Sequence, residues 1–235
     1  MNLGILTAIW GRPRLTELVL GYYEASELVR VAAISEREYE DHKISYHWNL
    51  HFCANDPLSD KWLEGMDMMH GIHNPDAVII VGSDDLVTPE YIEACRHLVA
   101  GGAEFVYLPG CYFYDAMSGR MIWGQAQRLG LGRCLSRSLL ERLDWQPWEP
   151  GLSHGLDGSM WGRIQEVGAK TVCLKDPRKH RLVGMDIKTE QNMWSFDHIR
   201  DEVISTDIED PAKVLREYFP GVADELINWN TEVKI

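Results

Sequence analysis

The segment Val78–Asp85, Val-Ile-Ile-Val-Gly-Ser-Asp-Asp, constrains the fold of this 235-residue chain more than any other. A short continuous Val/Ile run is typical of a central parallel strand that is covered on both faces. The run ends in two adjacent carboxylates, and ligands of open α/β sheets collect at the carboxyl ends of such strands. Because Asp84 and Asp85 repel each other, a divalent cation with oxygen ligands is the simplest explanation for the pair.

Apolar strand patterns and amphipathic helix patterns alternate through the first part of the chain. We expect strands at Leu3–Ile9, Val29–Ile34, His51–Ala54, Ala77–Val81 and Phe105–Leu108, with helices after Pro13, after Leu58 and at Pro89–Ala100. In the second half we expect a hairpin of Tyr112–Tyr114 and Met121–Trp123, helices at Leu135–Leu143, Gly158–Val167 and Pro211–Phe219, and a strand at Thr171–Leu174. This order predicts a doubly wound α/β fold, a mainly parallel sheet flanked by helices in a single globule.

Composition excludes some classes of function. The net charge of −13 argues against a broad nucleic-acid footprint, since that affinity comes largely from neutralised phosphates. Apolar runs such as Ala77–Val81 are far too short to span a bilayer, and Met1–Ile9 lacks a charged leader, so we expect a cytoplasmic protein with no membrane partner. Five cysteines without a Cys-x-x-Cys pattern favour reduced thiols over disulfides or zinc.

The order of these motifs resembles the GT-A glycosyltransferases, particularly the large inverting family two group. The resemblance runs from about residue 3 to about residue 195 and rests on Gly11-Arg-Pro-Arg14, Ser35-Glu36, Asn55 to Lys61, Ser83-Asp84-Asp85 and Leu156-Asp157. It implies a GT-A (Rossmann-like) domain over 1–235, with a nucleotide-sugar-binding half (1–110), an acceptor and catalytic half (111–195) and a C-terminal helical extension (196–235). Its DXD-like motif would bind Mn²⁺ or Mg²⁺, but Gly82 stands where the common Asp-x-Asp-Asp form has its first acid.

The resemblance also assigns binding residues. The metal would be held by Asp84, less securely by Asp85, and by His180 from the basic cluster Arg178–Arg181. The donor nucleotide sugar would contact Thr7, Ala8, Trp10, Arg12, Glu36, Asn55, Lys61, Ser83 and Asp84. Each has a plainer explanation: Trp10 as core, Arg12 and Lys61 as solvated charges, Asn55-Asp56-Pro57 as a turn, and the basic cluster as a solvated face.

Asp157 is the candidate base. An inverting transfer needs a group that removes the proton of the acceptor hydroxyl, and a carboxylate within hydrogen-bond reach can do this. The resemblance places Asp157 in that role, with His154 a weaker partner. The alternative is that Asp157 only caps the following helix. The polar segment Met185–Trp194 is interpreted as a lid or as an ordinary surface loop.

We therefore expect a metal-dependent glycosyltransferase that moves a sugar from a UDP- or GDP-sugar to a hydroxyl. The acceptor is open: a glycan, a small molecule, a protein or a hydroxymethylated DNA base of a phage, the last disfavoured by the acidic charge. One alternative is a non-catalytic GT-A-like module that binds nucleotide sugars. Another is a nucleotidyltransferase on a related fold, although no Gly-rich phosphate loop follows the first strand.

Overall fold

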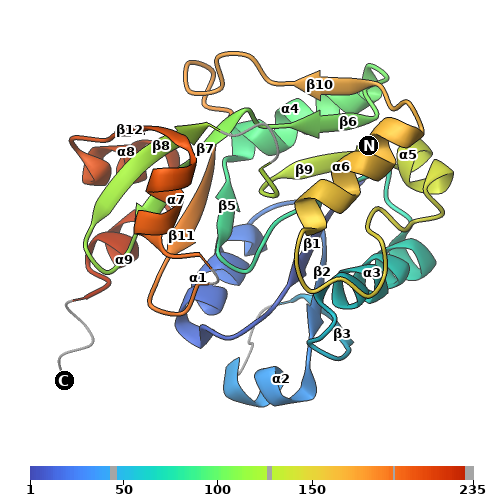
Figure 1. The fold of residues 1–235 in the computed structure, drawn as a ribbon, viewed down its shortest axis with the longest axis horizontal. Coiled ribbons are helices and arrows are strands. Elements are labelled where there is room, and N and C mark those ends of the chain that lie inside the picture. Colours follow the sequence, from blue (N-terminus) through green and yellow to red (C-terminus); the bar gives the residue numbers. More distant parts are fainter. Residues whose placement is uncertain (43–46, 126–128, 193, 231–235) are drawn as a thin grey trace.

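The computed structural model describes residues 1–42, 47–125, 129–192 and 194–230 (Figure 1). Within these residues the larger sheet has seven strands, in the order β10 (Thr171–Cys173), β6 (Phe105–Tyr107), β9 (Arg133–Ser136), β4 (Ala77–Ile80), β1 (Leu3–Ala8), β2 (Val29–Ile34) and β3 (Asn49–Phe52). The strands β4, β1, β2 and β3 are parallel, whereas β9 runs antiparallel to both β4 and β6. The predicted α/β fold with a mainly parallel sheet is confirmed.

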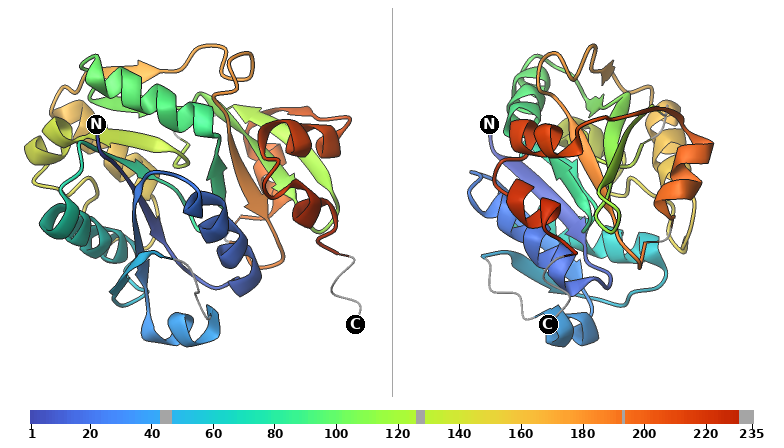
Figure 2. Two further views of the ribbon diagram at one scale, coloured as in Figure 1. Left: turned by 180° about the vertical axis from the view of Figure 1, so that it is seen from behind. Right: turned by 90° about the vertical axis from the view of Figure 1, so that its left-hand side faces the viewer.

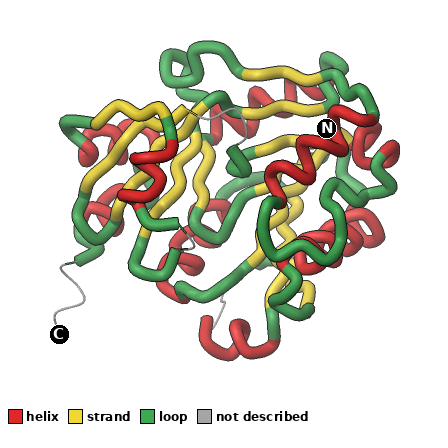
Figure 3. The backbone as a smooth tube through the Cα atoms, in the orientation of Figure 1, coloured by secondary structure: helices red, strands yellow, loops and turns green. Residues whose placement is uncertain are grey.

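Helices cover both faces of this sheet because side chains alternate along each strand. Leu3 and Ile5 of β1 belong to the same apolar cluster as residues of α1 (Pro13–Glu24) and α4 (Pro89–Ala100). Leu6 and Ala8 face the opposite way, into a cluster with α3 (Leu58–Met68), α5 (Arg137–Arg142) and α6 (Leu156–Glu166). Figures 2 and 3 show these helices lying around the strands. The remaining elements of this part are α2 (Glu36–His42) and a π-helical turn, η1 (Met69–His73).

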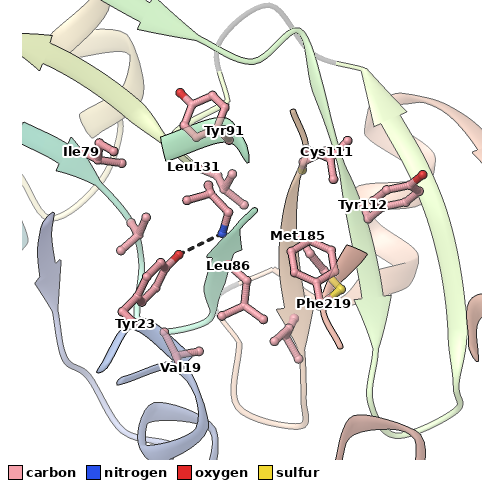
Figure 4. Packing of buried hydrophobic residues seen from close by; sticks show 14 of the residues in the cluster. Val19, Tyr23, Ile79, Leu86, Tyr91, Cys111, Tyr112, Leu131, Met185 and Phe219 are labelled. Atoms are coloured by element: carbon pink, nitrogen blue, oxygen red, sulfur yellow. Dashed lines mark hydrogen bonds between the residues drawn. The ribbon is translucent and has the colours of Figure 1, made fainter. Parts of the chain in front are cut away.

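A second sheet lies beside the first. In the described part of the chain its order is β12 (Ile204–Asp207), β8 (Arg120–Gln125), β7 (Gly110–Asp115), β11 (Gly184–Lys188) and β5 (Asp85–Val87). The predicted hairpin is the antiparallel pair β7–β8. The C-terminal helices are α7 (Phe196–Glu202), α8 (Pro211–Tyr218) and α9 (Ala223–Ile227). Residues from Leu3 to Trp229 form one apolar cluster that joins the two sheets, part of which is drawn in Figure 4.

The structure corrects several expectations. Val78–Asp85 is not one strand, since β4 ends at Ile80 and Asp85 opens β5 in the other sheet. The helix expected at Leu135–Leu143 begins only at Arg137, because the preceding residues pair as β9 and Ser136 caps the helix. The 196–235 extension is not purely helical, since β12 pairs with β8. The expected boundary between the two halves at residue 110 does not separate the two sheets. Strands β9 and β10, which follow residue 110, belong to the first sheet, and β5, which precedes it, belongs to the second. No helix of the described residues is long and apolar enough to cross a bilayer.

Candidate functional site

A cavity of about 340 Å³ lies where the first sheet meets the second. It begins beyond the carboxyl end of β4 and continues along β5, β7 and β11 to the start of α6. The charged side chains that line it are Asp84, Asp85, Arg133, Asp157, Asp186 and Lys188, and the aromatic ones are Trp62, Phe113, Trp148 and Trp194. The two centres that the sequence predicted, Asp84-Asp85 and Asp157, therefore share one cavity.

Asp84 is held as an anion in the turn between β4 and β5. Its Oδ2 accepts hydrogen bonds from Arg12 Nη1 at 2.6 Å and from Asn192 Nδ2 at 2.8 Å. Arg12 also donates to Ser83 Oγ at 3.1 Å. Burial alone would raise the pKa of Asp84, but the positive charges of Arg12 and Lys188 lower the pKa below its ordinary value.

Asp85 and Asp186 form a second acidic group, directly opposite each other in the antiparallel pair of β5 and β11. Like charges in this arrangement repel each other. Burial, followed by the neighbouring carboxylates Asp84 and Asp186, raises the pKa of Asp85 well above its ordinary value. Burial likewise raises the pKa of Asp186 to about 6, against the attraction of Lys188, whose Nζ lies 2.7 Å from Asp186 Oδ2. Additional positive charge near Asp85 and Asp186 would therefore stabilise their ionised forms.

The missing acid at Gly82 has a steric reason. A Cβ at this position would lie 2.7 Å from Asp84 Oδ1 and 2.9 Å from Asp85 Oδ2, closer than real Cβ contacts. The backbone N–H of Gly82 donates to Asp85 Oδ2 at 2.6 Å. Any side chain at residue 82 would push one of these carboxylates aside. The observed positions of Asp84 and Asp85 therefore require glycine at this position.

Asp157 lies in the first turn of α6, where a carboxylate is favoured by the helix dipole. It is not the N-cap: that residue is Gly155, which makes no side-chain capping bond. Its side chain is 55% exposed towards the cavity, and Oδ1 is paired with Arg133 Nη1 at 3.4 Å. Surrounding protein raises the pKa of Asp157 by removing bulk water, and Arg133 opposes that rise. The capping alternative is thus not what the structure shows.

A second cavity of about 230 Å³ adjoins the first. Five of the predicted donor residues line it: Ala8, Trp10, Arg12, Ser83 and Asp84. Trp10 is 50% exposed and Trp194 is 54% exposed, so both indoles are available to a ligand. Asp84 and Lys188 line both cavities and thus lie at their junction.

Other predicted donor residues lie apart from the cavities. Thr7 is fully buried, and its Oγ1 has no hydrogen-bond partner. Glu36 is exposed on α2. Lys61 Nζ is buried and donates to Glu38 Oε2 at 3.0 Å and to Asn55 Oδ1 at 2.5 Å. Lys61 is therefore not the solvated charge of the plainer explanation, because its ammonium group is buried in a hydrogen-bond network.

The basic cluster is also remote from the acids. His180 is exposed on the turn that precedes β11, and neither cavity is lined by it. Arg181 is paired with Glu90 of α4 at 2.7 Å, and Lys179 borders a separate groove. His154 is exposed. The structure therefore does not bring His180 together with Asp84 and Asp85.

The acidic side chains offer part of a ligand set for a divalent cation. In the described residues no three His, Cys, Asp or Glu side chains are arranged to hold a metal ion by themselves. Asp186 Oδ1, however, is buried and has no hydrogen-bond partner. Three carboxylates, Asp84, Asp85 and Asp186, face two cations, Arg12 and Lys188. An orphaned acceptor and an excess of carboxylates fit a hard cation whose remaining ligands come from outside the chain.

Sequence reasoning missed Arg133, Asp186, Lys188 and Asn192. The sequence predicts a lid or surface loop at Met185–Trp194, but residues 185–188 of that segment belong to the strand β11, with Met185 and Ile187 fully buried. The alternation of these apolar residues with Asp186 and Lys188 is a two-residue period that could have identified a strand. Met193 of the same segment lies outside the described residues.

The comparisons with known proteins support the fold. No protein-family model matches the sequence, and no curated protein matches it. Among solved structures, S. aureus TarS (residues 1–349) aligns with a TM-score of 0.56 at 9% identity, over 80% of this chain and 60% of that one. The fold is GT-A-like. A197 from STIV aligns with a TM-score of 0.51 at 13% identity, covering 84% and 92% of the two chains. A mycobacterial protein aligns with a TM-score of 0.52 at 10% identity, over 81% of this chain and 68% of that one.

Proposed function

We propose that this chain is a metal-dependent glycosyltransferase that moves a sugar from a nucleotide sugar to an acceptor hydroxyl. The observation that carries the proposal is the placement of Asp157 and the Asp84-Asp85 pair on walls of one cavity. A transferase needs a site that stabilises the leaving group and a base near the acceptor. A GT-A-like fold is consistent with both.

The donor would bind across the junction of the two cavities. Trp10 offers an aromatic face for the base, and Arg12 and Lys188 offer positive charge for the diphosphate. Asp84, with Asp85 or Asp186, would hold Mg²⁺ or Mn²⁺, which when bound supplies Lewis-acid stabilisation of the leaving diphosphate. Lys188, which is buried and ion-paired with Asp186, would contribute positive charge toward the same phosphates.

Asp157 would accept the proton of the acceptor hydroxyl as its oxygen attacks the anomeric carbon. Its carboxylate is open to the cavity, and its raised pKa brings its basicity closer to the working pH than that of a solvated Asp. Direct attack with Asp157 as base gives inversion. The aromatic side chains Trp62, Phe113 and Trp148 provide flat apolar surface for the acceptor.

The test is a donor screen that reads the leaving group. Wild-type protein is incubated with UDP- and GDP-sugars, Mn²⁺ and a panel of hydroxyl acceptors, and released nucleoside diphosphate is measured. We expect turnover that Asp84→Ala abolishes and that Asp157→Asn lowers by about 10²- to 10⁴-fold in kcat. Release of pyrophosphate from nucleoside triphosphates would identify a nucleotidyltransferase instead, and Mn²⁺-dependent binding of nucleotide sugars without turnover would identify a binding module.

A glycine pair provides the matched control. Gly82→Ala places a Cβ against both carboxylates and should reduce both turnover and Mn²⁺ affinity, which isothermal titration measures without any substrate. Gly162→Ala, in the middle of α6 with no atom within 4 Å of its new Cβ, should leave both unchanged. Unaltered Mn²⁺ affinity in Gly82→Ala and Asp84→Ala would rule out the metal assignment.

A further inference from the structure

Arg133 is a buried cation at the edge of the larger cavity. It is the first residue of β9, opposite Ile80 of β4, and only 1% of its surface is exposed. A fully buried arginine is rare because its charge is costly to remove from water, and it is tolerated where charged or polar partners compensate. Its place in the middle of the sheet fixes where the guanidinium can lie.

The guanidinium joins the loop before β9 to the first turn of α6. Arg133 Nε donates to the carbonyl oxygen of Leu129 at 2.8 Å. Its Nη1 lies 3.4 Å from both the backbone carbonyl oxygen and Oδ1 of Asp157, and 3.4 Å from Met160 Sδ. One rigid group thus contacts the main chain and the carboxylate of the same residue.

Gly130 confines the carboxylate from another side. A Cβ on this glycine would lie 2.5 Å from Asp157 Oδ1 and 3.2 Å from Asp157 Oδ2. The Asp157 carboxylate therefore sits in a slot between the Gly130 backbone and the Arg133 guanidinium, and the slot opens into the cavity. Only a residue without a side chain leaves this slot open.

We propose that Arg133 is a positioning residue that holds the Asp157 carboxylate, as an anion, in this slot and aimed at the cavity. The inference rests on the proposed role of Asp157 as base. Displacing a reacting group by about 1 Å can cost about 100-fold in rate, so a fixed anchor has a direct catalytic value. The other charged groups that line the cavity Asp157 faces are Asp84, Asp85, Asp186 and Lys188.

Replacing Arg133 with a neutral residue should change the pKa of Asp157 in a defined direction. With Arg133→Gln, the surrounding protein still keeps bulk water from the Asp157 carboxylate but the charge of Arg133 no longer opposes it, so the pKa of Asp157 rises further. The deprotonated base is then present only at higher pH. The acid limb of the kcat profile should move to higher pH, with a loss of kcat that is largest at low pH and recovers as the pH is raised. Arg133→Lys keeps the charge and should keep the limb, while losing kcat through looser positioning.

The deciding measurement does not need turnover. The ¹³C resonance of the Asp157 carboxyl, identified by its absence in Asp157→Asn, is titrated in wild type, Arg133→Gln and the control Arg137→Gln. Arg137 is the next arginine in the chain, and it pairs with Asp76 outside the cavity. We expect a higher midpoint in Arg133→Gln alone. An unchanged midpoint overturns the inference, whereas failure of every donor in the wild type would overturn the proposed function and leave this titration valid.

A second variant covers the case in which Arg133→Gln does not fold. Gly130→Ala should push the carboxylate out of the slot and lower kcat by at least tenfold with little change in thermal stability, since the group that must move is the end of one side chain. Gly158→Ala, adjacent to Asp157 in α6, is the control, because beyond its chain neighbours and the backbone of its own helix the new Cβ meets no atom within 4 Å. Equal activity in the two alanine variants would show that the slot does not position the base.

Discussion

Asp186 stands opposite Asp85 in the sheet, and burial raises its pKa from 3.8 to about 6 despite the attraction of Lys188. The folded chain therefore keeps this proton to a higher pH than the unfolded chain does. Where the folded state binds more protons, the free energy of unfolding falls as the pH rises. Asp186 therefore destabilises the folded state most above about pH 6 and least below about pH 4. A carboxylate whose pKa is lowered by a positive partner has the opposite effect, because it stabilises the fold at the higher pH.

A substitution isolates this effect. We expect the unfolding free energy of wild type minus that of Asp186→Asn to fall by about 2 kcal/mol between pH 4 and pH 7, because a shift of one pKa unit corresponds to about 1.4 kcal/mol and part of the change lies below pH 4. Urea denaturation without divalent cations, repeated at each pH, measures it. Asp201→Asn, at an exposed aspartate of α7, is the control. A pH-independent difference for Asp186→Asn would contradict the assigned protonation.

At the scale of elements, α2 holds the turn that delivers Arg12. The Oε1 of Glu38 accepts the N–H of Gly11 at 2.9 Å, and His42 Nε2 lies 2.8 Å from the Gly11 carbonyl oxygen. Both Gly11 and Arg12 have left-handed backbones, with φ of 57° and 55°, a conformation that costs a non-glycine residue about 1 kcal/mol. Beneath the turn, Glu38 is ion-paired with the fully buried Lys61. The turn geometry is therefore imposed by α2 and α3.

Breaking the ion pair between Glu38 and Lys61 should lower the free energy of unfolding strongly. Glu38→Gln leaves Lys61 buried with a neutral partner, and removing one member of a buried pair typically costs about 3–5 kcal/mol. Urea denaturation at pH 7 measures the loss. Glu36→Gln, two residues earlier on the exposed face of the same helix, should change stability by less than about 0.5 kcal/mol. Equal losses in the two variants would show that the buried pair does not support the turn.

Many of the elements that the sequence predicted carry a continuous apolar run or an amphipathic helical pattern. Strands β1, β2 and β4 and helices α1, α3 and α4 each carry an apolar face that local reasoning detects. Helix α2 escaped because only Glu38 and His42 of its residues are buried, so no apolar face exists. Strand β5 was missed because the sequence pattern joins its first residue, Asp85, to the preceding apolar run.

At the scale of the whole molecule, pairing between distant segments decides the site. Asp84 and Asp157 were predicted because each stands next to a recognisable element. Asp186 and Lys188 were not, because only the pairing of β11 with β5 places them beside the acids. Arg133 was missed because the sequence predicted no element at residues 133–134, whereas pairing of β9 with both β4 and β6 makes them part of a strand. Such register is a property of the folded sheet and leaves little local trace.

One side chain connects the two sheets through a helix. Tyr23 of α1 is 1% exposed. Its hydroxyl accepts the N–H of Val87 at 2.9 Å (Figure 4) and donates to the carbonyl oxygen of Asp85 at 3.2 Å. Both partners belong to β5, the strand that carries the acids into the second sheet. The apolar cluster around Tyr23 is continuous with the C-terminal helices. The two sheets should therefore unfold as one cooperative unit.

Tyr23→Phe tests this cooperativity. The substitution leaves a buried N–H and a buried carbonyl oxygen without their partner, which should lower the free energy of unfolding by about 1–3 kcal/mol. Far-ultraviolet circular dichroism and tryptophan fluorescence, followed through one urea titration, should give coincident transitions in wild type and shift together in the variant. Tyr39→Phe, at a tyrosine that is 42% exposed, should match wild type. Two separate transitions, or a shift in one probe alone, would mean that the sheets are independent units and that the cavity between them is assembled from parts that can open without unfolding.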